Sequence, residues 1–357
     1  MKINQLVLRG IALLLLIIAA TSLINSQTGL PYISNFTISE EDLTENYSLV
    51  QDSQGIIFTA NRKGILSFDG EDWQIIKTPD MPTVLAISSA TNTIYVGCRN
   101  TVGYLSKNSL GKYEFNSLSD HKTGFVSQII VHNNKVYFLS DSLLLYVTDN
   151  SLPSKVVVAN NQANKFMCMI PFGSQLFIDI AGKGLFSLKN NKADEKVKNF
   201  TLSEQVVFTI PLEKSTIIGA SDNKLYFFDG KNVSAFRSQA DQILLQGTII
   251  GGKKVTQSVI AIATAYAGCI FIDIKTGKTI YTINTQNGLP DDAIYAIEVD
   301  QNNGIWLTHG YGLSRIDINL PVRNFSHYKG LDGKLHAIAM FKSKLYIGST
   351  TGVLVLN

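Results

Sequence analysis

The chain has 357 residues, of which 45% are hydrophobic and only 17% are charged, and its formal net charge is +3. This composition excludes an intrinsically disordered chain, and the length is enough for a sizeable core. Without residues 1–26, which contain Lys2 and Arg9 but no acidic residue, 29 basic and 28 acidic residues remain. Such a near-neutral balance argues against charge-driven binding of nucleic acid.

The N-terminal segment has the order of a secretory signal. Lys2 and Arg9 precede an apolar run from Ile11 to Ala20, and the polar stretch TSLINSQ follows. The run is about ten residues long, whereas a membrane-spanning helix needs about 20. We predict a signal peptide in residues 1–26, with an uncleaved anchor as the alternative. Residues 27–357 are then expected to be a periplasmic or otherwise extracytoplasmic domain.

The rest of the chain repeats one strand-turn-strand pattern. Residues 304–317, GIWLTHGYGLSRID, have seven similar stretches upstream and downstream, spaced by 38 to 45 residues. The middle of the first strand in each stretch falls at Ile57, Tyr95, Tyr137, Phe177, Ile217, Ala261, Trp306 and Tyr346.

Each repeat carries two further strand-like runs, one before and one after this hairpin. Four strands in about 40 residues is the period of a β-propeller blade. A glycine opens the second hairpin strand in six of the eight repeats, where the turn needs a positive φ or a close backbone approach: Gly64, Gly103, Gly184, Gly268, Gly312 and Gly352. The predicted fold is therefore all-β, a propeller of four-stranded antiparallel blades.

The two ends of the array predict how the ring closes. The stretch LPYISNFTIS (30–39) resembles LPVRNFSHYK (320–329), and the eighth repeat has only three strands before Asn357. We predict eight blades in which the N-terminal strand supplies the missing fourth strand, since closure removes the exposed sheet edges. Seven blades is the alternative count.

No catalytic or metal-binding constellation is visible in the sequence. The three cysteines, Cys98, Cys168 and Cys269, lie inside apolar runs, which indicates buried thiols. The five histidines have no metal-ligand spacing, and no nucleophile elbow or HExxH motif is present. We therefore predict no catalytic residues, no metal and no cofactor.

Candidate ligand-binding residues lie in the turns between the second and third strands, which share one face of a propeller around its channel. They are Arg62, Arg99, Asp141, Lys183, Asp222, Tyr266, His309 and Tyr311. Arginine, tyrosine, histidine and aspartate together suit a polar, sugar-like ligand. The alternative is that most of them are solvated turn residues.

One repeat resembles a known family. In residues 287–317, Gly288-Leu289-Pro290, Asp300, Gly304, Trp306, Gly312-Leu313 and Arg315 match the two-component-regulator propeller repeat in order. The first repeat resembles the opening blade of the family's extracytoplasmic sensors through Asp52, Gly55, Gly64, Asp69-Gly70 and Trp73. The other six repeats are degenerate copies.

The resemblance implies a periplasmic sensor module of Bacteroidetes-type signalling proteins, whose members usually continue into further blades, a transmembrane helix and an output domain. This chain is then either the sensor part of a longer regulator or a separate periplasmic propeller. We predict a non-catalytic ligand-sensing domain, with an oligosaccharide or other small molecule as ligand and a homodimer as a possible assembly. Membrane association is expected only through the N-terminal segment or missing C-terminal parts. The alternatives are a propeller enzyme of the lyase, lactonase or quinoprotein kind and a protein-interaction scaffold.

Overall fold

The computed structural model describes residues 29–40, 43–119, 122–140, 144–148, 157–158, 165–190, 192–325, 331 and 333–356. The predicted signal peptide in residues 1–26 lies outside the described residues. The chain divides into two compact units, Tyr32–Asn319 and the two ends that flank it, Met1–Pro31 with Leu320–Asn357. Each unit is described separately.

The larger unit consists of seven four-stranded antiparallel sheets, numbered here as blades 1 to 7. Blade 1 contains β2 (Asn46–Gln51), β3 (Ile57–Asn61), β4 (Gly64–Phe68) and β5 (Trp73–Ile76), and blade 2 contains β6 (Pro82–Ile87), β7 (Ile94–Cys98), β8 (Val102–Lys107) and β9 (Tyr113–Ser117). Blade 3 contains β10 (Val126–His132), β11 (Lys135–Ser140), β12 (Leu144–Thr148) and β13 (Val157–Val158), and blade 4 contains β14 (Phe166–Phe172), β15 (Gln175–Ile180), β16 (Gly184–Lys189) and β17 (Lys192–Lys196).

Blade 5 contains β18 (Val206–Pro211), β19 (Thr216–Ala220), β20 (Leu225–Phe228) and β21 (Val233–Phe236), and blade 6 contains β22 (Ile249–Lys254), β23 (Val259–Thr264), β24 (Cys269–Asp273) and β25 (Thr279–Ile283). Blade 7 combines β26 (Ile294–Val299), β27 (Ile305–His309) and β28 (Gly312–Asp317) with the first strand of the chain, β1 (Tyr32–Thr37). A helix α2 (Asp241–Gly247) links blades 5 and 6, and a 3₁₀ turn η2 (Thr285–Asn287) links blades 6 and 7.

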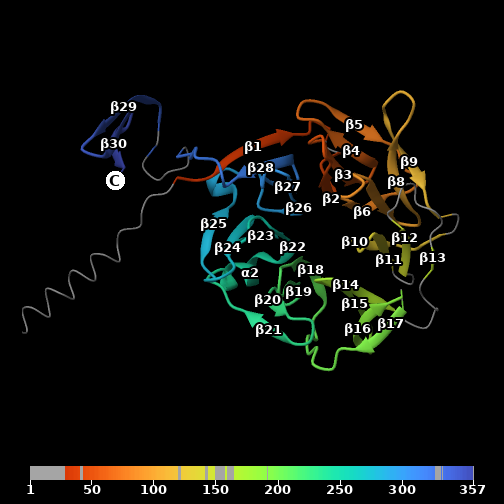
Figure 1. The fold of residues 1–357 in the computed structure, drawn as a ribbon. Helices are drawn as coiled ribbons and strands as arrows, with labels where there is room; N and C mark the ends of the chain where they lie inside the picture. The colour runs from red at the N-terminus through yellow and green to blue at the C-terminus, as the bar shows by residue number, and fades with distance from the viewer. Residues whose placement is uncertain are drawn as a thin grey trace, which may run out of the picture. The chain divides into compact units, whose positions relative to one another are not determined.

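The seven blades form a closed ring. Each innermost strand contacts the innermost strands of the two adjacent blades, and β2 contacts β26 across the join between the first and last blades (Figure 1). The strand β1 completes blade 7 by pairing along β28 from Tyr32 opposite Asp317 to Thr37 opposite Gly312. All-β blades and closure by the N-terminal strand were predicted, and both are present.

The predicted count of eight blades is not confirmed, and the ring has the alternative count of seven. The eighth repeat forms β29 (Leu335–Phe341), β30 (Lys344–Ser349) and β31 (Gly352–Leu356), a separate three-stranded sheet in the smaller unit. The physical reason is the position of β1. It completes the seventh repeat instead of the eighth, so the ring closes one blade earlier than predicted.

The core lies between adjacent blades. The second strands β3, β7, β19 and β27 are buried along their whole length, because neighbouring sheets cover both of their faces. Between blades 1 and 2, for example, Phe58 and Ile65 pack with Ile94 and Val96. This arrangement explains why these strands read as short continuous apolar runs.

The family-like residues of blade 7 hold the sheet together. One oxygen of Asp300 accepts hydrogen bonds from the backbone N–H groups of Asn302 and Gly304, which closes the turn between β26 and β27. Its other oxygen accepts the Trp306 indole N–H at 3.0 Å and the Arg315 Nε at 2.7 Å. Burial opposes the charge on Asp300, but the bonds to Arg315 and to the backbone outweigh it and hold the pKa of this carboxyl below its usual value. The repeat motif therefore has a structural role.

Candidate ligand-binding site at the channel mouth

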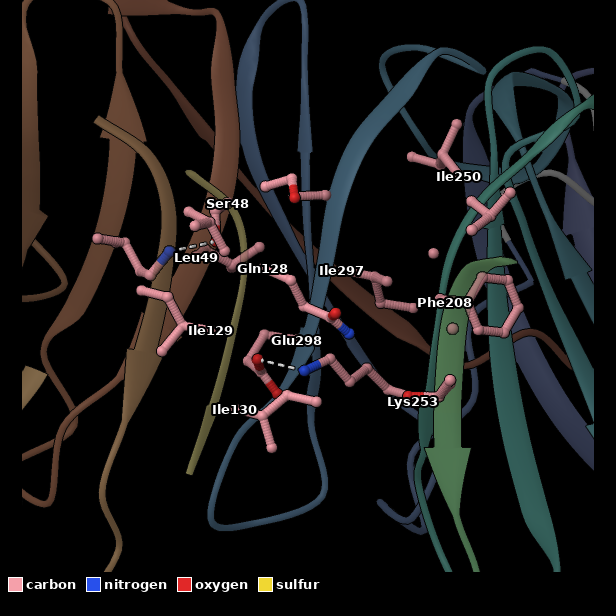
Figure 2. A pocket seen from close by; sticks show the side chains of 18 of the residues that line it. Ser48, Leu49, Gln128, Ile129, Ile130, Phe208, Ile250, Lys253, Ile297 and Glu298 are labelled. Carbon is pink, nitrogen blue, oxygen red and sulfur yellow. Dashed lines mark hydrogen bonds and ion pairs between the residues drawn. The ribbon is translucent and has the colours of Figure 1, made fainter. Parts of the chain in front are cut away.

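The seven innermost strands surround a cavity of about 530 Å³ on the axis of the ring. Every blade of the larger unit contributes to its wall, from Leu49 of β2 to Ile297 of β26. Figure 2 shows part of this wall, with Leu49 and Ile297 among the labelled residues. A cavity of this size is within the range of small-molecule sites in proteins.

A β-bulge occurs at the same position in each of the seven innermost strands. The register of pairing skips one residue near the start of the strand, at the end of the channel where the turns between second and third strands also lie. Bulges of this kind re-aim a side chain and are frequent beside functional sites. The skipped residues are Tyr47, Thr83, Ser127, Met167, Val207, Ile250 and Tyr295.

Two tyrosines stand in this ring of bulged residues, and they belong to adjacent blades. Tyr47 and Tyr295 both line the cavity, and each is 38% exposed. The Tyr47 hydroxyl donates to Glu45 at 2.7 Å, and this bond, with partial burial, raises the pKa of Tyr47. Burial and the nearby negative charge of Asp291 raise the pKa of Tyr295. The channel mouth at blades 1 and 7 thus combines two half-exposed aromatic rings with two carboxylates.

The wall between the two ends of the channel carries both apolar and polar side chains, and the other end carries an ion pair. Leu49, Leu85 and Ile297 are buried along the wall. Further along the strands, Lys253 of β22 and Glu298 of β26 form a salt bridge of 2.7 Å, which Figure 2 shows between neighbouring strands. The two ends of the channel therefore differ in chemistry: tyrosines and carboxylates at one end, a paired lysine and glutamate at the other.

The structure places His309, one of the predicted ligand-contact residues, away from solvent. The side chain is 1% exposed. Its Nδ1 accepts the backbone N–H of Tyr311 at 3.2 Å, so the ring proton is on Nε2, which donates to Ser314 Oγ at 2.8 Å. Ser314 in turn donates to Asn35 Oδ1 of β1 at 2.7 Å. Burial lowers the pKa of His309 to about 4, and the imidazole is a neutral structural link between β27, β28 and β1.

The other predicted residues have varied surroundings. Tyr311 and Tyr266 are exposed, by 57% and 72%, and Arg62, Arg99 and Lys183 are also exposed in their turns. Arg62 is close enough to Tyr47 for its positive charge to act on the hydroxyl, which connects it with the channel mouth. The Asp222 carboxylate is engaged within its own blade, since it accepts hydrogen bonds from the Tyr226 hydroxyl and from the Lys224 ammonium group. Asp141 lies outside the described residues.

The turns therefore contribute Arg62 to the mouth, whereas the two tyrosines that line the cavity come from the strands. The candidates predicted from the sequence include neither Tyr47 nor Tyr295. One signal was available: both tyrosines are the second residue of an innermost strand, β2 (NYSLVQ) and β26 (IYAIEV). The bulge that turns this position toward the channel leaves no mark in the sequence.

The cysteines behave as buried thiols. All three are buried and free, and burial raises the pKa of Cys98 to about 12 and also raises the pKa values of Cys168 and Cys269. Among the residues that the structure describes, no group of three or more His, Cys, Asp or Glu side chains is placed to hold a metal ion. No helix in the described part of the chain has the length and apolar character needed to cross a membrane.

Comparison with known proteins identifies similar structures but no close relative. No protein-family model and no curated protein matches the chain. The extracellular domain of the putative one component system BT4673 from B. thetaiotaomicron superposes with a TM-score of 0.64 and 17% identity, over 92% of this chain and 46% of that one. The extracellular domain of the putative hybrid two component system BT3049 from the same organism gives 0.62 and 16%, over 91% and 48%. This chain therefore spans about half the length of these two domains.

A streptogramin B lyase has the same fold with a TM-score of 0.61 and 14% identity, over 81% of this chain and 98% of that one. The extracellular domains of the regulators match the family that the repeat motif resembles. At these identities the likeness defines the fold, and residues 32–319 form a β-propeller like those of extracellular domains of bacterial two-component regulators.

Proposed function

We propose that this chain is the extracytoplasmic ligand-binding propeller of a signal-transduction regulator, and that its ligand is a neutral oligosaccharide bound at the channel mouth between blades 1 and 7. The observation that carries the proposal is the pair Tyr47 and Tyr295, half exposed on adjacent innermost strands at the wall of one cavity. Tyrosine rings offer flat apolar faces to the C–H groups of a sugar, and their hydroxyls offer hydrogen bonds at low conformational cost.

The charges at the mouth favour a neutral sugar over an acidic one. Glu45 is bonded to Tyr47, and Asp291 acts on Tyr295. These carboxylates can accept hydrogen bonds from sugar hydroxyls but would repel a carboxylated or sulfated ligand. The bond to Glu45 raises the pKa of Tyr47, and the positive charge of Arg62 partly offsets this rise. Burial and the negative charges of Asp291 and Glu45 raise the pKa of Tyr295.

A binding role fits the site better than the enzymatic alternative. A lyase shares the propeller fold, so the fold itself does not distinguish the two functions. The distinction comes from the side chains. His309, the last residue of β27, is buried with both ring nitrogens engaged, so it cannot exchange protons with a ligand in the channel. His132 does line the cavity, but it lies at the end of β10 away from the bulge, and its Nε2 is engaged with the Ser174 carbonyl oxygen at 3.0 Å.

The proposal is tested by isothermal titration calorimetry of the purified propeller against neutral oligosaccharides, with uronic-acid and sulfated oligosaccharides in parallel. We expect a neutral oligosaccharide to bind and Tyr47→Ala and Tyr295→Ala each to weaken its binding at least tenfold. Tyr32→Ala is the matched control, since Tyr32 is 45% exposed on β1 and does not line the cavity.

Two results would contradict the proposal. Preferential binding of acidic oligosaccharides would exclude the assigned ligand class. Loss of binding in Tyr266→Ala with no effect of Tyr47→Ala would move the site to the turn of blade 6.

A further inference from the structure

Blade 7 is the one blade of the ring whose fourth strand does not follow its third strand in the chain. In the other six blades the four strands are consecutive, whereas blade 7 has the order β26, β27, β28 and then β1. The stretch that follows β28 in the chain, residues 320–325, is the copy of β1 that the sequence repeat revealed. Asn324-Phe325 corresponds to Asn35-Phe36, and a Leu-Pro pair precedes each.

We propose that residues 320–325 and β1 are alternative fourth strands for blade 7, so that the ring can exchange its closing strand. The exchange is a conformational device in the fold and is independent of the proposed ligand.

The register on β28 permits both pairings. Asn35 lies opposite Ser314 and Phe36 opposite Leu313. If Asn324 and Phe325 take these two places, Pro321 falls opposite Asp317, and residues 318–320 form a three-residue connection. Hairpin loops of two to five residues are the usual length, and proline is tolerated at the first residue of an edge strand.

Residues 320–325 can make the same side-chain contacts as β1. Phe36 packs against Trp306 of blade 7 at 5.4 Å between ring centroids and against Phe68 of blade 1 at 5.1 Å. Asn35 accepts from Ser314 and donates to the backbone oxygen of Gly288 at 3.1 Å. Phe325 and Asn324 provide the same ring and the same amide.

The strand β1 is also held less firmly than a core strand. None of its six residues is buried, and Tyr32, Asn35 and Thr37 are exposed. Within the smaller unit, the residue before Pro31 already pairs with the copy, because Leu30 and Asn324 exchange two backbone hydrogen bonds of 2.9 and 2.8 Å. The segment that directly precedes β1 in the chain is therefore already paired with the copy.

Exchange would reach the channel mouth through one loop. Asn35 holds the Gly288 carbonyl, and Gly288 precedes Asp291 and Tyr295 in the same segment. When the copy replaces β1, the hydrogen bond from Asn35 to Gly288 breaks and Asn324 has to form it again. The exchange of strands is therefore coupled to the segment that carries Asp291 and Tyr295.

Hydrogen-exchange mass spectrometry of Phe36→Ala, Phe325→Ala and the double variant tests the proposal, since backbone amides that lose their partner exchange faster. In Phe36→Ala we expect the β1 amides to exchange at least ten times faster, those of 320–325 to gain protection, and β28 to remain protected because the copy replaces β1. In the double variant β28 should lose protection as well. Phe325→Ala alone is the control and should leave β1 and β28 unchanged.

The proposal is overturned if Phe36→Ala exposes β28 as much as the double variant does and 320–325 gains nothing. If Phe36→Ala does not fold, Phe36→Leu is measured in its place, because a smaller apolar side chain weakens the contacts with Trp306 and Phe68 without removing them. The same two outcomes then decide the question.

Discussion

The aromatic ring of Phe36, in the first strand of the ring, stacks on the indole of Trp306 with the planes inclined by 22°. The same phenylalanine is 5.1 Å from Phe68 of blade 1, which stacks in turn on Trp73 at 4.4 Å. This aromatic cluster joins the first and last blades, and it lies on the strand whose position decides the number of blades.

The stability of the propeller is expected to fall as the pH decreases from about 6.5 to 4. The pKa of His309 is about 4 in the folded state, below its usual value of about 6.5, so the unfolded chain binds a proton that the folded chain excludes. The stability that depends on the neutral His309 is fully present above pH 6.5. About 3 kcal/mol of the free energy of unfolding is lost by pH 4. Urea denaturation at several pH values measures it.

His309→Asn is the matched variant for this effect, because Asn61 occupies the corresponding position in blade 1. We expect a flatter pH profile between 6.5 and 4 in this variant. An unchanged slope would show that another group causes the dependence.

Asp300→Asn should destabilise the protein by about 3 kcal/mol, because it removes the more buried of the two carboxylates that pair with Arg315 and leaves only Asp317 to balance its charge. The Asp300 side chain is 2% exposed and accepts from Arg315, Trp306 and the turn backbone. Asp52→Asn is the comparison in blade 1, where the second carboxylate oxygen accepts the Tyr113 hydroxyl at 2.9 Å and has no arginine. We expect this variant to lose about 1–2 kcal/mol. Equal losses in chemical denaturation would contradict the assigned role of the Arg315 pair.

Gly312→Ala is expected to cost clearly more than Gly352→Ala. Both residues have a positive φ, 130° and 140°, at the start of the third strand of their repeat. A Cβ on Gly312 would come within 2.3 Å of the Phe36 carbonyl oxygen, whereas a Cβ on Gly352 meets nothing within 4 Å. The Gly352 variant should lose about 1 kcal/mol through backbone strain alone, and the Gly312 variant more. Similar unfolding free energies for the two variants would show that β1 can move away from the new Cβ of residue 312 without loss of stability.

The Lys253–Glu298 pair should contribute little to stability. The side chains are 42% and 22% exposed, so water screens the interaction, and a coupling free energy below about 1 kcal/mol is expected. A double-mutant cycle with Lys253→Met and Glu298→Gln measures the coupling. A value well above this limit would indicate that the far end of the channel excludes water.

The repeat, the strands and the turns could be predicted because each depends on local chemistry. The Asp300-to-Gly304 turn and the glycines that open third strands each depend on a few consecutive residues. Their positions define where each blade begins and ends in the sequence. The number of blades could not be predicted in the same way. It depends on which of two similar segments, 32–37 or the stretch after β28, occupies one sheet edge, and that is a competition between distant parts of the chain.

The candidate site was predicted less well than the fold. His309 was selected because it lies at the predicted turn between the second and third strands, but its two ring nitrogens are satisfied inside blade 7. Tyr47 lies on a strand that alternation assigns to the blade, and only the bulge between Asn46 and Ser48 aims it at the channel. Hydrophobic alternation predicts the face of a regular strand and fails at a residue that the register skips.

The position of β1 also constrains the order in which the protein folds. During synthesis β1 emerges first, but its partner β28 is made only after the other six blades, each of which is a run of consecutive hairpins. Local hairpins form quickly, while pairing of distant segments has to overcome a large loop-closure entropy. The growing chain therefore carries β1 without its partner until β28 has been made, and the ring can close only after that point.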